Sequence, residues 1–465
     1  MTAYTSELSA YSDDGRSFVV ADATGSRLIP GTFVVIASAH SRQLALVEER
    51  SDGEPVRLRG RLLGDLAADG IDPRAGHAFE RGAVEPADAA TVQMLHERTG
   101  AILDVGTDLS APGRPVRVLP TRFNRHTFWC GQSGSGKTYA LGVVLEQLIA
   151  HTALPIVIFD PNSDFARLGD VRPEASGPTA QALRTRDIRV LNARGSAGTR
   201  LCARFLSMPL ASKAAILRLD PVADREEFNE LLHLGSYLEA GPTLDVREIE
   251  NALGRLRDTG GAAARRLTMR VENLRLSGWE AWAGGDRAVT EIVAERPDVT
   301  VLELGGFSTP EQHLVVALAL LDDLWDRREE RRPLLLVIDE AHTLASPRLE
   351  SPVAVAVRER LIQIAAEGRK FGLWLLLSTQ RPTRVHPGII SQCDNLALMK
   401  MTSPADLDEL GTYFGYVPRA LLARSPWFRQ GEALFAGGFV PAPALVQIHS
   451  RLTYEGGGDV DVPLR

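Results

Sequence analysis

Residues 131–138 read Gly-Gln-Ser-Gly-Ser-Gly-Lys-Thr, and this stretch matches the phosphate-binding loop pattern G-x-x-x-x-G-K-[ST] at every fixed position. In such a loop the glycines let backbone N–H groups turn toward phosphate oxygens. The lysine reaches the β- and γ-phosphates, and the hydroxyl of the next residue holds Mg²⁺. Lys137 and Thr138 are therefore predicted to bind ATP together with Mg²⁺. The rest of the predicted cradle consists of Gly131, Gln132, Ser133, Gly134, Ser135 and Gly136.

The sequence on either side of the loop predicts a strand and a helix. Residues 126–130 form a short apolar run, and residues 139–150 place Leu141, Val144 and Leu148 on one helical face. A strand, this loop and then a helix is the context in which the motif binds phosphate. We therefore interpret residues 131–138 as a nucleotide-binding loop rather than as a chance turn.

A second motif supplies carboxylates for hydrolysis. Residues 334–338 are continuously apolar, and Asp339 and Glu340 follow them directly. A buried parallel strand delivers such a pair to the carboxyl edge of a sheet, where the phosphate loop is also expected. Asp339 is predicted to support Mg²⁺. Glu340 is predicted to polarise the water that attacks the γ-phosphate.

Two more polar residues end predicted strands, and an arginine lies between them in sequence. Asp160 and Gln380 should reach the same edge of the sheet, where Gln380 would sense the γ-phosphate or orient the water. Arg369 belongs to the stretch Glu-Gly-Arg-Lys-Phe-Gly at 367–372. In a ring of subunits, an arginine can enter the neighbour's site and stabilise transition-state charge. Such an arginine would make hydrolysis depend on assembly.

Two classes of ATPase share parts of this pattern but fit less well. The string Asp-Glu-Ala-His at 339–342 also occurs in helicases with two tandem motor domains. The sequence after His342 is too short for a second motor domain. A transporter-type ATPase needs a Leu-Ser-Gly-Gly-Gln signature shortly before the acidic pair, and the Leu-Ser-Gly-Trp of 276–279 is a poor match that comes too early.

The strand and helix pattern changes along the chain. Before residue 115, short β-rich runs separated by turns predict a small barrel or sandwich, followed by a helix at 87–97. Strands that alternate with helices then predict a parallel sheet with covered faces. The β-rich runs are residues 17–21, 32–37, 44–48 and 56–63, and the later strands are residues 154–160, 187–191, 299–304, 333–339, 374–378 and 396–399.

The bulk composition is that of an ordinary soluble globular protein, with 44% hydrophobic and 24% charged residues. The net charge of −7 argues against a surface coated with basic residues for nucleic acid, but it is compatible with a local basic channel. No stretch approaches the roughly 20 apolar residues that cross a membrane. Without a signal peptide, and with Cys130, Cys202 and Cys393 expected as buried free thiols, we expect a cytoplasmic protein.

In this order, the motifs resemble the HerA helicase/translocase family of the HerA–FtsK superfamily of P-loop NTPases. The resemblance covers the chain from about residue 100 to its C-terminus. The β-rich N-terminal region resembles the barrel domain of the same family. Besides the phosphate loop, the matching stretches are residues 124–126, 160–165, 337–342, 367–372, 378–382, 389–393 and 431–434.

The resemblance implies an α/β fold with a RecA-like P-loop NTPase core and a parallel sheet. Residues 1–115 would form a small N-terminal β-barrel domain, and residues 116–204 and 286–430 the ATPase core. Residues 205–285 match a helical insertion, and residues 431–465 resemble a C-terminal strap that packs on a neighbour. The resemblance also implies a homohexameric ring around double-stranded DNA, with ATP bound between subunits.

The resemblance also implies roles for particular residues. Glu340 is the catalytic acidic residue, Arg369 is the finger that acts on the neighbouring subunit, and Arg125 and Asp160 match positions linked to ATP turnover. One stretch departs from the family, which usually carries Asp-Pro-His-Gly-Glu-Tyr. This chain has Asp-Pro-Asn-Ser-Asp-Phe at 160–165, and the shorter acid at 164 is consistent with slower turnover.

Two functional hypotheses follow from the resemblance. In the first, the ring is a motor that drives double-stranded DNA through its pore, with a partner nuclease of the NurA type. In the second, the ring is a scaffold that organises an effector enzyme of anti-phage defence and uses ATP turnover as a control. The altered 160–165 stretch and the acidic net charge favour the second. A secretion or conjugation coupling ATPase is a third reading, disfavoured because no membrane anchor is evident.

Overall fold

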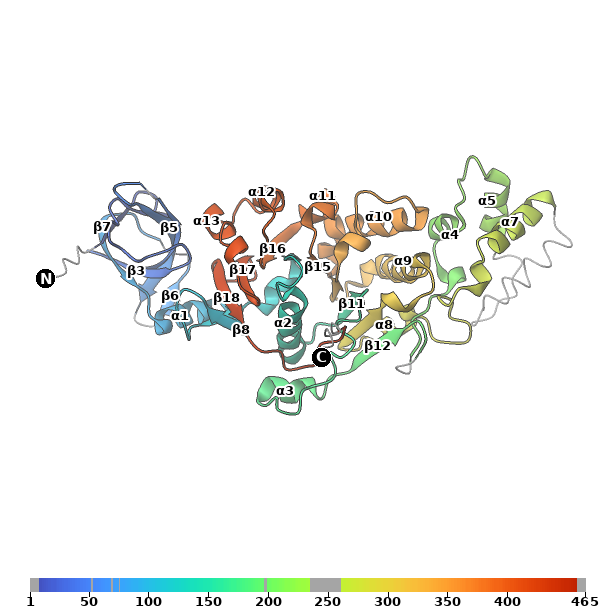
Figure 1. Cartoon of the computed structure of the whole chain (residues 1–465), viewed down its shortest axis with the longest axis horizontal. Helices are drawn as coiled ribbons and strands as arrows, with labels where there is room; N and C mark the ends of the chain where they lie inside the picture. Colours follow the sequence, from blue (N-terminus) through green and yellow to red (C-terminus); the bar gives the residue numbers. More distant parts are fainter. Residues whose placement is uncertain are drawn as a thin grey trace, which may run out of the picture. The chain divides into compact units, whose positions relative to one another are not determined.

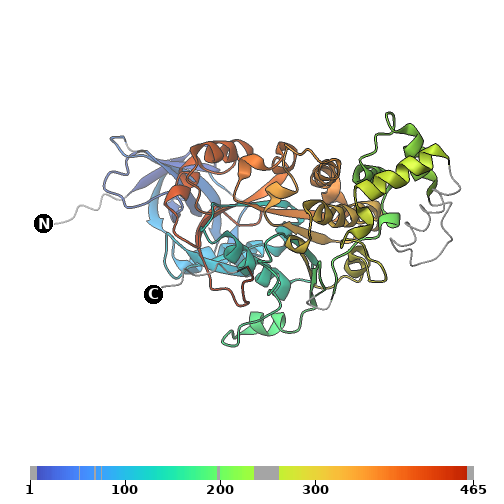
Figure 2. The same ribbon diagram turned by 45° about the vertical axis from the view of Figure 1, so that its right-hand side comes forward.

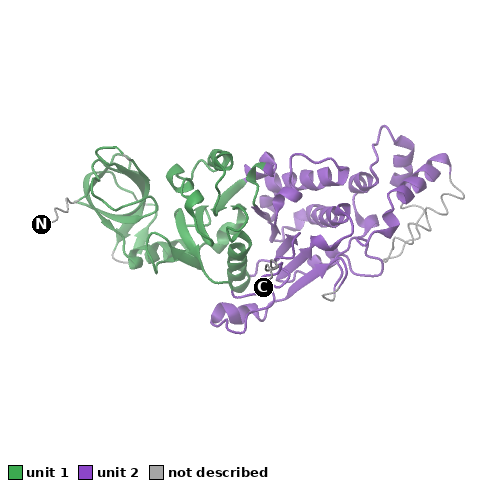
Figure 3. Cartoon of the chain, viewed as in Figure 1, with its two compact units in different colours: residues 1–152, 380–383, 393–451 green, residues 153–379, 384–392, 452–465 purple. Residues whose placement is uncertain are grey.

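The computed structural model describes residues 8–51, 53–67, 70–74, 76–195, 199–234 and 261–457. The chain divides into two compact units, shown in green and purple in Figure 3. Unit 1 comprises residues 1–152, 380–383 and 393–451. Unit 2 comprises residues 153–379, 384–392 and 452–465. Residues 235–260 of the predicted helical insertion and the last eight residues of the predicted strap lie outside the described residues.

The amino-terminal part of unit 1 is a closed β-barrel (Figure 1; Figure 2). Its strands are β1 (Ser9–Ser12), β2 (Ser17–Val20), β3 (Phe33–Ser38), β4 (Arg42–Arg50), β5 (Leu58–Ala67), β6 (Gly70–Asp72) and β7 (Phe79–Pro86). They follow the order β2-β1-β7-β3-β4-β5-β6, and an additional antiparallel pairing of β2 with β5 closes the barrel. The predicted barrel is therefore confirmed, with β1, β6 and β7 as strands that the sequence pattern did not indicate.

Alternation of side chains along the strands separates two small cores. Val34 and Ile36 of β3 point into the barrel, where they join its buried interior. Phe33, on the opposite face of β3, packs outside the barrel against the helix α1 (Ala89–Thr99), which contributes Leu95. The helix begins at the cap residue Asp88, whose carboxylate accepts a hydrogen bond from a backbone N–H of the first turn.

Unit 1 also contains six strands of a second sheet. They are β8 (Leu103–Asp108), β9 (Pro115–Val118), β10 (His126–Cys130), β16 (Cys393–Leu398), β17 (Glu432–Gly437) and β18 (Ala444–Ile448). β10 pairs with β16 in parallel, and the pairs β16–β17, β17–β18, β18–β8 and β8–β9 are antiparallel. The helices α2 (Lys137–His151), α12 (Pro404–Tyr413) and α13 (Arg419–Leu422) belong to the same unit.

Unit 2 contains five parallel strands in the order β12-β13-β11-β14-β15. They are β11 (Ile156–Asp160), β12 (Ile188–Asn192), β13 (Val299–Glu303), β14 (Leu334–Ile338) and β15 (Leu373–Thr379). All five residues of β11 and of β14 are buried, as a parallel sheet with covered faces requires. The predicted parallel strands are thus confirmed.

Helices accompany the parallel strands of unit 2. They are α3 (Pro178–Leu183), α4 (Leu210–Leu217), α5 (Arg225–His233), α7 (Ala262–Asn273), α8 (Val289–Ala294), α9 (Pro310–Asp326), α10 (Pro352–Glu367) and α11 (Pro387–Ile390). α9 and α10 pack side by side, and α4 contacts both (Figure 1). Proline at the first position of α9 and of α10 fixes where each helix starts, because its missing N–H has no partner there in any case.

The α/β fold class is confirmed, whereas the predicted domain boundaries stay predictions. β8 lies within the predicted barrel domain 1–115 but pairs with β18 in the second sheet of unit 1. β17 and β18 lie within the predicted strap 431–465 and pair with strands of their own chain. The cysteines Cys130, Cys202 and Cys393 are free and buried, as predicted. Among the described residues, no helix combines the length and the apolar character that a bilayer crossing needs.

A buried ion pair fixes α2, the helix that follows the phosphate-binding loop. Arg451 and Glu146 lie 3.6 Å apart with side chains 0% and 1% exposed. Arg451 occupies the space beside Gly142, where an added Cβ would lie 2.7 Å from the guanidinium. Its backbone N–H also donates to the Tyr139 hydroxyl at 2.7 Å. These contacts hold one side of α2 to the end of unit 1.

Candidate nucleotide-binding and hydrolysis site

The loop 131–138 joins β10 to α2 in unit 1, as the sequence predicts. Gly134 and Gly136 have φ angles of 75° and 85°, in the left-handed region that glycine adopts without strain. Gly136 directly precedes the helix and has no side chain to cap it. The N–H groups of the first helical turn and the positive end of the helix dipole are thus left for an anion. Lys137 begins the helix and is 7% exposed.

Hydrogen bonds tie the loop to two strands that are distant in sequence. Gln132 N donates to Lys400 O at 2.8 Å, just after β16. The Gln132 side-chain oxygen accepts from the backbone N–H and the hydroxyl of Thr402, at 3.2 and 2.8 Å. Gly431 N, just before β17, donates to Ser135 O at 3.0 Å. The predicted cradle residues are therefore held in one conformation by the sheet of their own unit.

Close packing explains the first glycine of the loop. A Cβ at Gly131 would lie 2.8 Å from both Met399 Cβ and Ser135 Oγ. These distances are shorter than carbon and oxygen atoms tolerate, so a larger residue would displace the loop from β16. Thr138, the predicted Mg²⁺ ligand, lies half-buried in the first turn of α2.

Three carboxylates converge in unit 2 at the ends of two parallel strands. Asp160 ends β11, Asp339 follows β14, and Asp164 comes from the loop after β11. Each offers an oxygen, and these oxygens all lie within 4.8 Å of one another. Carboxylate oxygens are the donors that Mg²⁺ prefers, so the donor set fits that ion. Ser378 Oγ donates to Asp339 Oδ1 at 2.7 Å and orients that carboxylate.

The pKa of Asp160 is raised to about 7, chiefly by burial. The nearby negative charges of Asp339 and Asp164 contribute to the same rise. Two backbone hydrogen bonds act in the opposite direction, because Asp164 N and Phe165 N donate to the carboxylate at 3.0 and 2.8 Å. Backbone hydrogen bonds thus stabilise the charged form of Asp160, whereas loss of water around it is destabilising. A bound cation would offset that destabilisation.

The loop after β11 is packed against the end of unit 2. Gly456 N donates to Asp164 O at 3.0 Å. A Cβ at Gly456 would lie 1.9 Å from Ser163 O, so only glycine allows this approach. Residues beyond the predicted core therefore position the stretch 160–165 that departs from the family pattern.

Glu340 adopts a strained backbone conformation. Its φ of 45° places it in the left-handed region, which costs a residue with a Cβ about 1–2 kcal/mol. Its Oε2 lies 3.1 Å from His342 Nδ1, and the same nitrogen lies 3.2 Å from the Thr379 hydroxyl at the end of β15. Strain of this kind persists where surrounding contacts impose it, and it is concentrated at functional sites.

The remaining predicted residues occupy separate places. Arg369 lies half-buried in the turn Gly368–Phe371 that follows α10. A Cβ at Gly368 would lie 2.9 Å from Leu373 O, so the turn requires glycine before the arginine. Gln380 follows β15 and is half-buried. Arg125, just before β10, lies 3.9 Å from Asp394 in a largely exposed ion pair that contributes little stability.

The structure adds residues to which sequence reasoning gave no role. They are Asp164, Ser378 and His342, which contribute to the carboxylate cluster or contact the predicted acids. Ser378 is the next-to-last residue of an apolar strand. A hydroxyl residue at the end of such a strand is the sequence feature that could have indicated its role. His342 follows Glu340 by two residues, but spacing alone does not show which way its ring turns.

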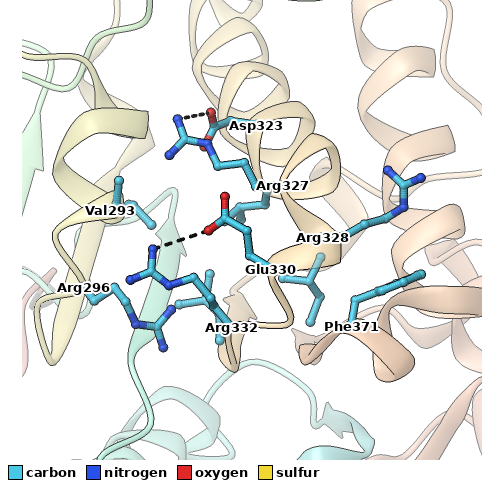
Figure 4. A pocket seen from close by; sticks show the side chains of 12 residues that line it. Val293, Arg296, Asp323, Arg327, Arg328, Glu330, Arg332 and Phe371 are labelled. Carbon is cyan, nitrogen blue, oxygen red and sulfur yellow. Dashed lines mark ion pairs between the residues drawn. The ribbon is translucent and has the colours of Figure 1, made fainter.

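A small cavity lies at the other end of β14 (Figure 4). It has a volume of about 50 Å³ and is lined from α8, α9 and the first residues of β14 and β15. Arg327 pairs with Asp323 at 2.8 Å, and Arg332 with Glu330 at 3.6 Å. None of the predicted site residues lines it, so this cavity is not part of the candidate site.

Comparison with known proteins relates this geometry to a family. Residues 103–324 match the family model described as the central domain of helicase HerA. The chain is 22% identical to a DNA double-strand break repair helicase HerA of Pyrococcus furiosus, over 87% of this chain and 79% of that protein. It is 32% identical to a probable helicase of Methanocaldococcus jannaschii over 30% of this chain, and spans 26% of that protein's length.

A solved structure shows the same fold. VirB4 of Thermoanaerobacter pseudethanolicus matches with a TM-score of 0.51 and 16% identity, over 76% of this chain and 97% of that chain. At this identity the likeness concerns the fold alone, and it agrees with the α/β P-loop architecture described above.

The raised pKa of Asp160 predicts a pH dependence in protein free of divalent cations. The folded state keeps a proton on this carboxyl up to about pH 7, whereas the unfolded chain releases it near the ordinary value of 3.8. The stability contributed by Asp160 is thus complete below pH 3.8 and is lost as the pH rises to about 7. Chemical unfolding at a series of pH values should show this slope in the wild type and a flatter profile in Asp160→Asn. The exposed Asp326→Asn is the matched control, and equal slopes in all three proteins would contradict the assignment.

Proposed function

We propose that this chain, whose residues 103–324 match the model of the central domain of helicase HerA, binds and hydrolyses ATP. The observation that carries the proposal is the loop 131–138 in its strand–loop–helix setting, with Lys137 buried at the start of α2. Backbone N–H groups and a lysine at that place suit a polyphosphate. The carboxylates that follow β11 and β14 supply the acidic groups that hydrolysis needs.

Each residue has a role in this proposal. Thr138 and Asp339 hold Mg²⁺, which when bound neutralises charge on the phosphate oxygens. Glu340 accepts a proton from the attacking water. Gln380 orients that water, and Arg125 and Asp160 support turnover. The left-handed backbone of Glu340 and its contact with His342 fix the carboxylate before substrate arrives.

Replacement of Glu340 tests this assignment. Glu340→Gln keeps the size of the side chain but removes the proton acceptor, so ATP hydrolysis should fall by about 10²- to 10⁴-fold while ATP binding persists. Steady-state phosphate release and calorimetric ATP binding measure the two quantities. Glu367→Gln, at an exposed acid of α10, is the control and should behave as the wild type. A Glu340→Gln protein with normal turnover would refute the site.

We further propose a homohexameric ring in which Arg369 acts on the neighbouring subunit. The turn Gly368–Phe371 presents this arginine immediately after α10. Guanidinium groups stabilise the charge that spreads over the γ-phosphoryl oxygens in the transition state. An arginine donated by another subunit makes each site complete only in the assembled ring.

Mixing two inactive variants tests this assembly dependence. Arg369→Ala should lose roughly 10³-fold or more of the hydrolysis rate, whereas Lys370→Ala, at the exposed neighbouring position, should retain it. Rings assembled from Arg369→Ala and Glu340→Gln chains together should regain activity. In such rings, the intact Glu340 of one chain meets the intact Arg369 of another. If the mixed rings stay inactive although both chains co-assemble, the arginine does not act between subunits.

For the ring as a whole, we propose an ATP-driven translocase on double-stranded DNA that works with a partner nuclease. The HerA helicases among its relatives support this function. A second candidate is a ring scaffold that controls an effector enzyme of anti-phage defence. It is favoured by the altered stretch 160–165 and by the net charge of −7, which limits the basic surface available for DNA.

The DNA response of the ATPase separates these two functions. A translocase should hydrolyse ATP several-fold faster when double-stranded DNA is added, and the stimulation should fall steeply with salt, because lysines and arginines would grip phosphates. The rate is measured with and without DNA over a salt series, with Glu340→Gln as the blank. No stimulation, together with a stable complex with the product of a neighbouring gene, would favour the scaffold.

A further inference from the structure

Trp427 is the most exposed of the chain's six tryptophans. It is 85% exposed, whereas Trp129, Trp282 and Trp325 are no more than 5% exposed. Tryptophan is highly buried on average in folded proteins, so a side chain this exposed is unusual. The other two, at 279 and 374, are half-buried.

The backbone around Trp427 is rigid. Ser425, two residues before Trp427, and Phe428, directly after it, are 0% and 4% exposed, so both are buried in unit 1. Trp427 N donates to Arg424 O at 3.0 Å, and Phe428 N donates to Ser425 O at 3.2 Å. These bonds close a tight turn that presents the indole outward in one conformation.

The same segment is fastened to the phosphate-binding loop on both sides. Upstream, Ser425 Oγ donates to Met399 O at 2.7 Å, and Met399 is the residue whose Cβ packs against Gly131. Downstream, Gly431 N donates to Ser135 O at 3.0 Å. Gly431 lies four positions after Trp427, so their Cα atoms are at most about 14 Å apart. The backbone of Trp427 therefore lies within about 14 Å of Gly431, which is itself hydrogen-bonded to the phosphate cradle in the same unit.

We propose that Trp427 is the stacking surface for the base of the nucleotide whose phosphates bind residues 131–138. This inference rests on the proposed nucleotide binding and adds the base subsite to it. Aromatic side chains stack on any base because every base has a π-face. The subsite should thus strengthen binding of nucleotides without selecting strongly between adenine and guanine.

A comparison of ligands with and without a base tests the proposal. ADP and pyrophosphate both offer a diphosphate, and neither is consumed by hydrolysis, but only ADP carries a base. In full-length Trp427→Ala the dissociation constant for ADP should rise by about ten-fold or more, the effect expected for loss of one base–aromatic stack, while that for pyrophosphate stays within about two-fold. Trp427→Phe should restore most of the ADP affinity. Titration calorimetry of both ligands, with Mg²⁺ present throughout, supplies the values.

The controls distinguish the possible failures. Val222→Ala removes another strongly exposed apolar side chain, 82% exposed and in unit 2, and should change neither affinity. Equal losses for ADP and pyrophosphate in Trp427→Ala would overturn the proposal, because the residue would then act by shaping the loop. Unchanged ADP affinity with an altered assembly state in analytical ultracentrifugation would also overturn it and assign the indole to a contact between copies. If the wild type binds neither ligand, the proposed nucleotide binding itself fails.

Discussion

The hydrogen bonds that hold the loop 131–138 against β16 and β17 are the constraint on which the candidate site depends. A phosphate cradle works only if its N–H groups already point inward, since ordering a free glycine-rich loop costs about 1–2 kcal/mol per residue. Here Gln132 is hydrogen-bonded to Lys400 and Ser135 to Gly431. Gly131 packs so closely on Met399 that there is no room for a side chain at that position. The buried pair of Arg451 and Glu146 then fixes the helix that follows the loop.

The carboxylates of unit 2 are electrostatically unfavourable where they lie. Three acids come close together in a largely buried place, and the surrounding hydrogen bonds offset their desolvation and mutual repulsion only in part. Backbone N–H groups and Ser378 provide hydrogen bonds, yet the pKa of Asp160 stays raised to about 7. Glu340 adds a left-handed backbone to the same region. Such costs are typical of sites shaped to bind a cation and to move a proton rather than to stabilise the fold.

Much of the architecture was predictable from local pattern. The buried runs that became β11, β14 and β15, and the helix α2, were predicted within a few residues of their bounds, because continuous apolar runs and helical spacing reflect burial directly. β1, β6 and β7 were missed, since β1 and β6 are only four and three residues long and most residues of β7 are exposed. Pairing within the barrel orders these strands. Asp160 and Asp339 were correctly expected at strand ends that share an edge, which the neighbouring parallel strands β11 and β14 confirm.

By itself, the sequence determined that this chain has a phosphate-binding loop, an acidic pair after a buried strand, and an ordered set of motifs that resemble those of the HerA family. These depend on residue type and spacing along the chain, which local chemistry decides. Only the tertiary structure decided that Asp164 joins Asp160 and Asp339 and that His342 and Ser378 contact the predicted acids. It also decided that the segment around Trp427 is hydrogen-bonded through Gly431 to the phosphate-binding loop. Those relations join residues that are far apart in sequence or depend on which way a side chain turns, and packing alone sets both.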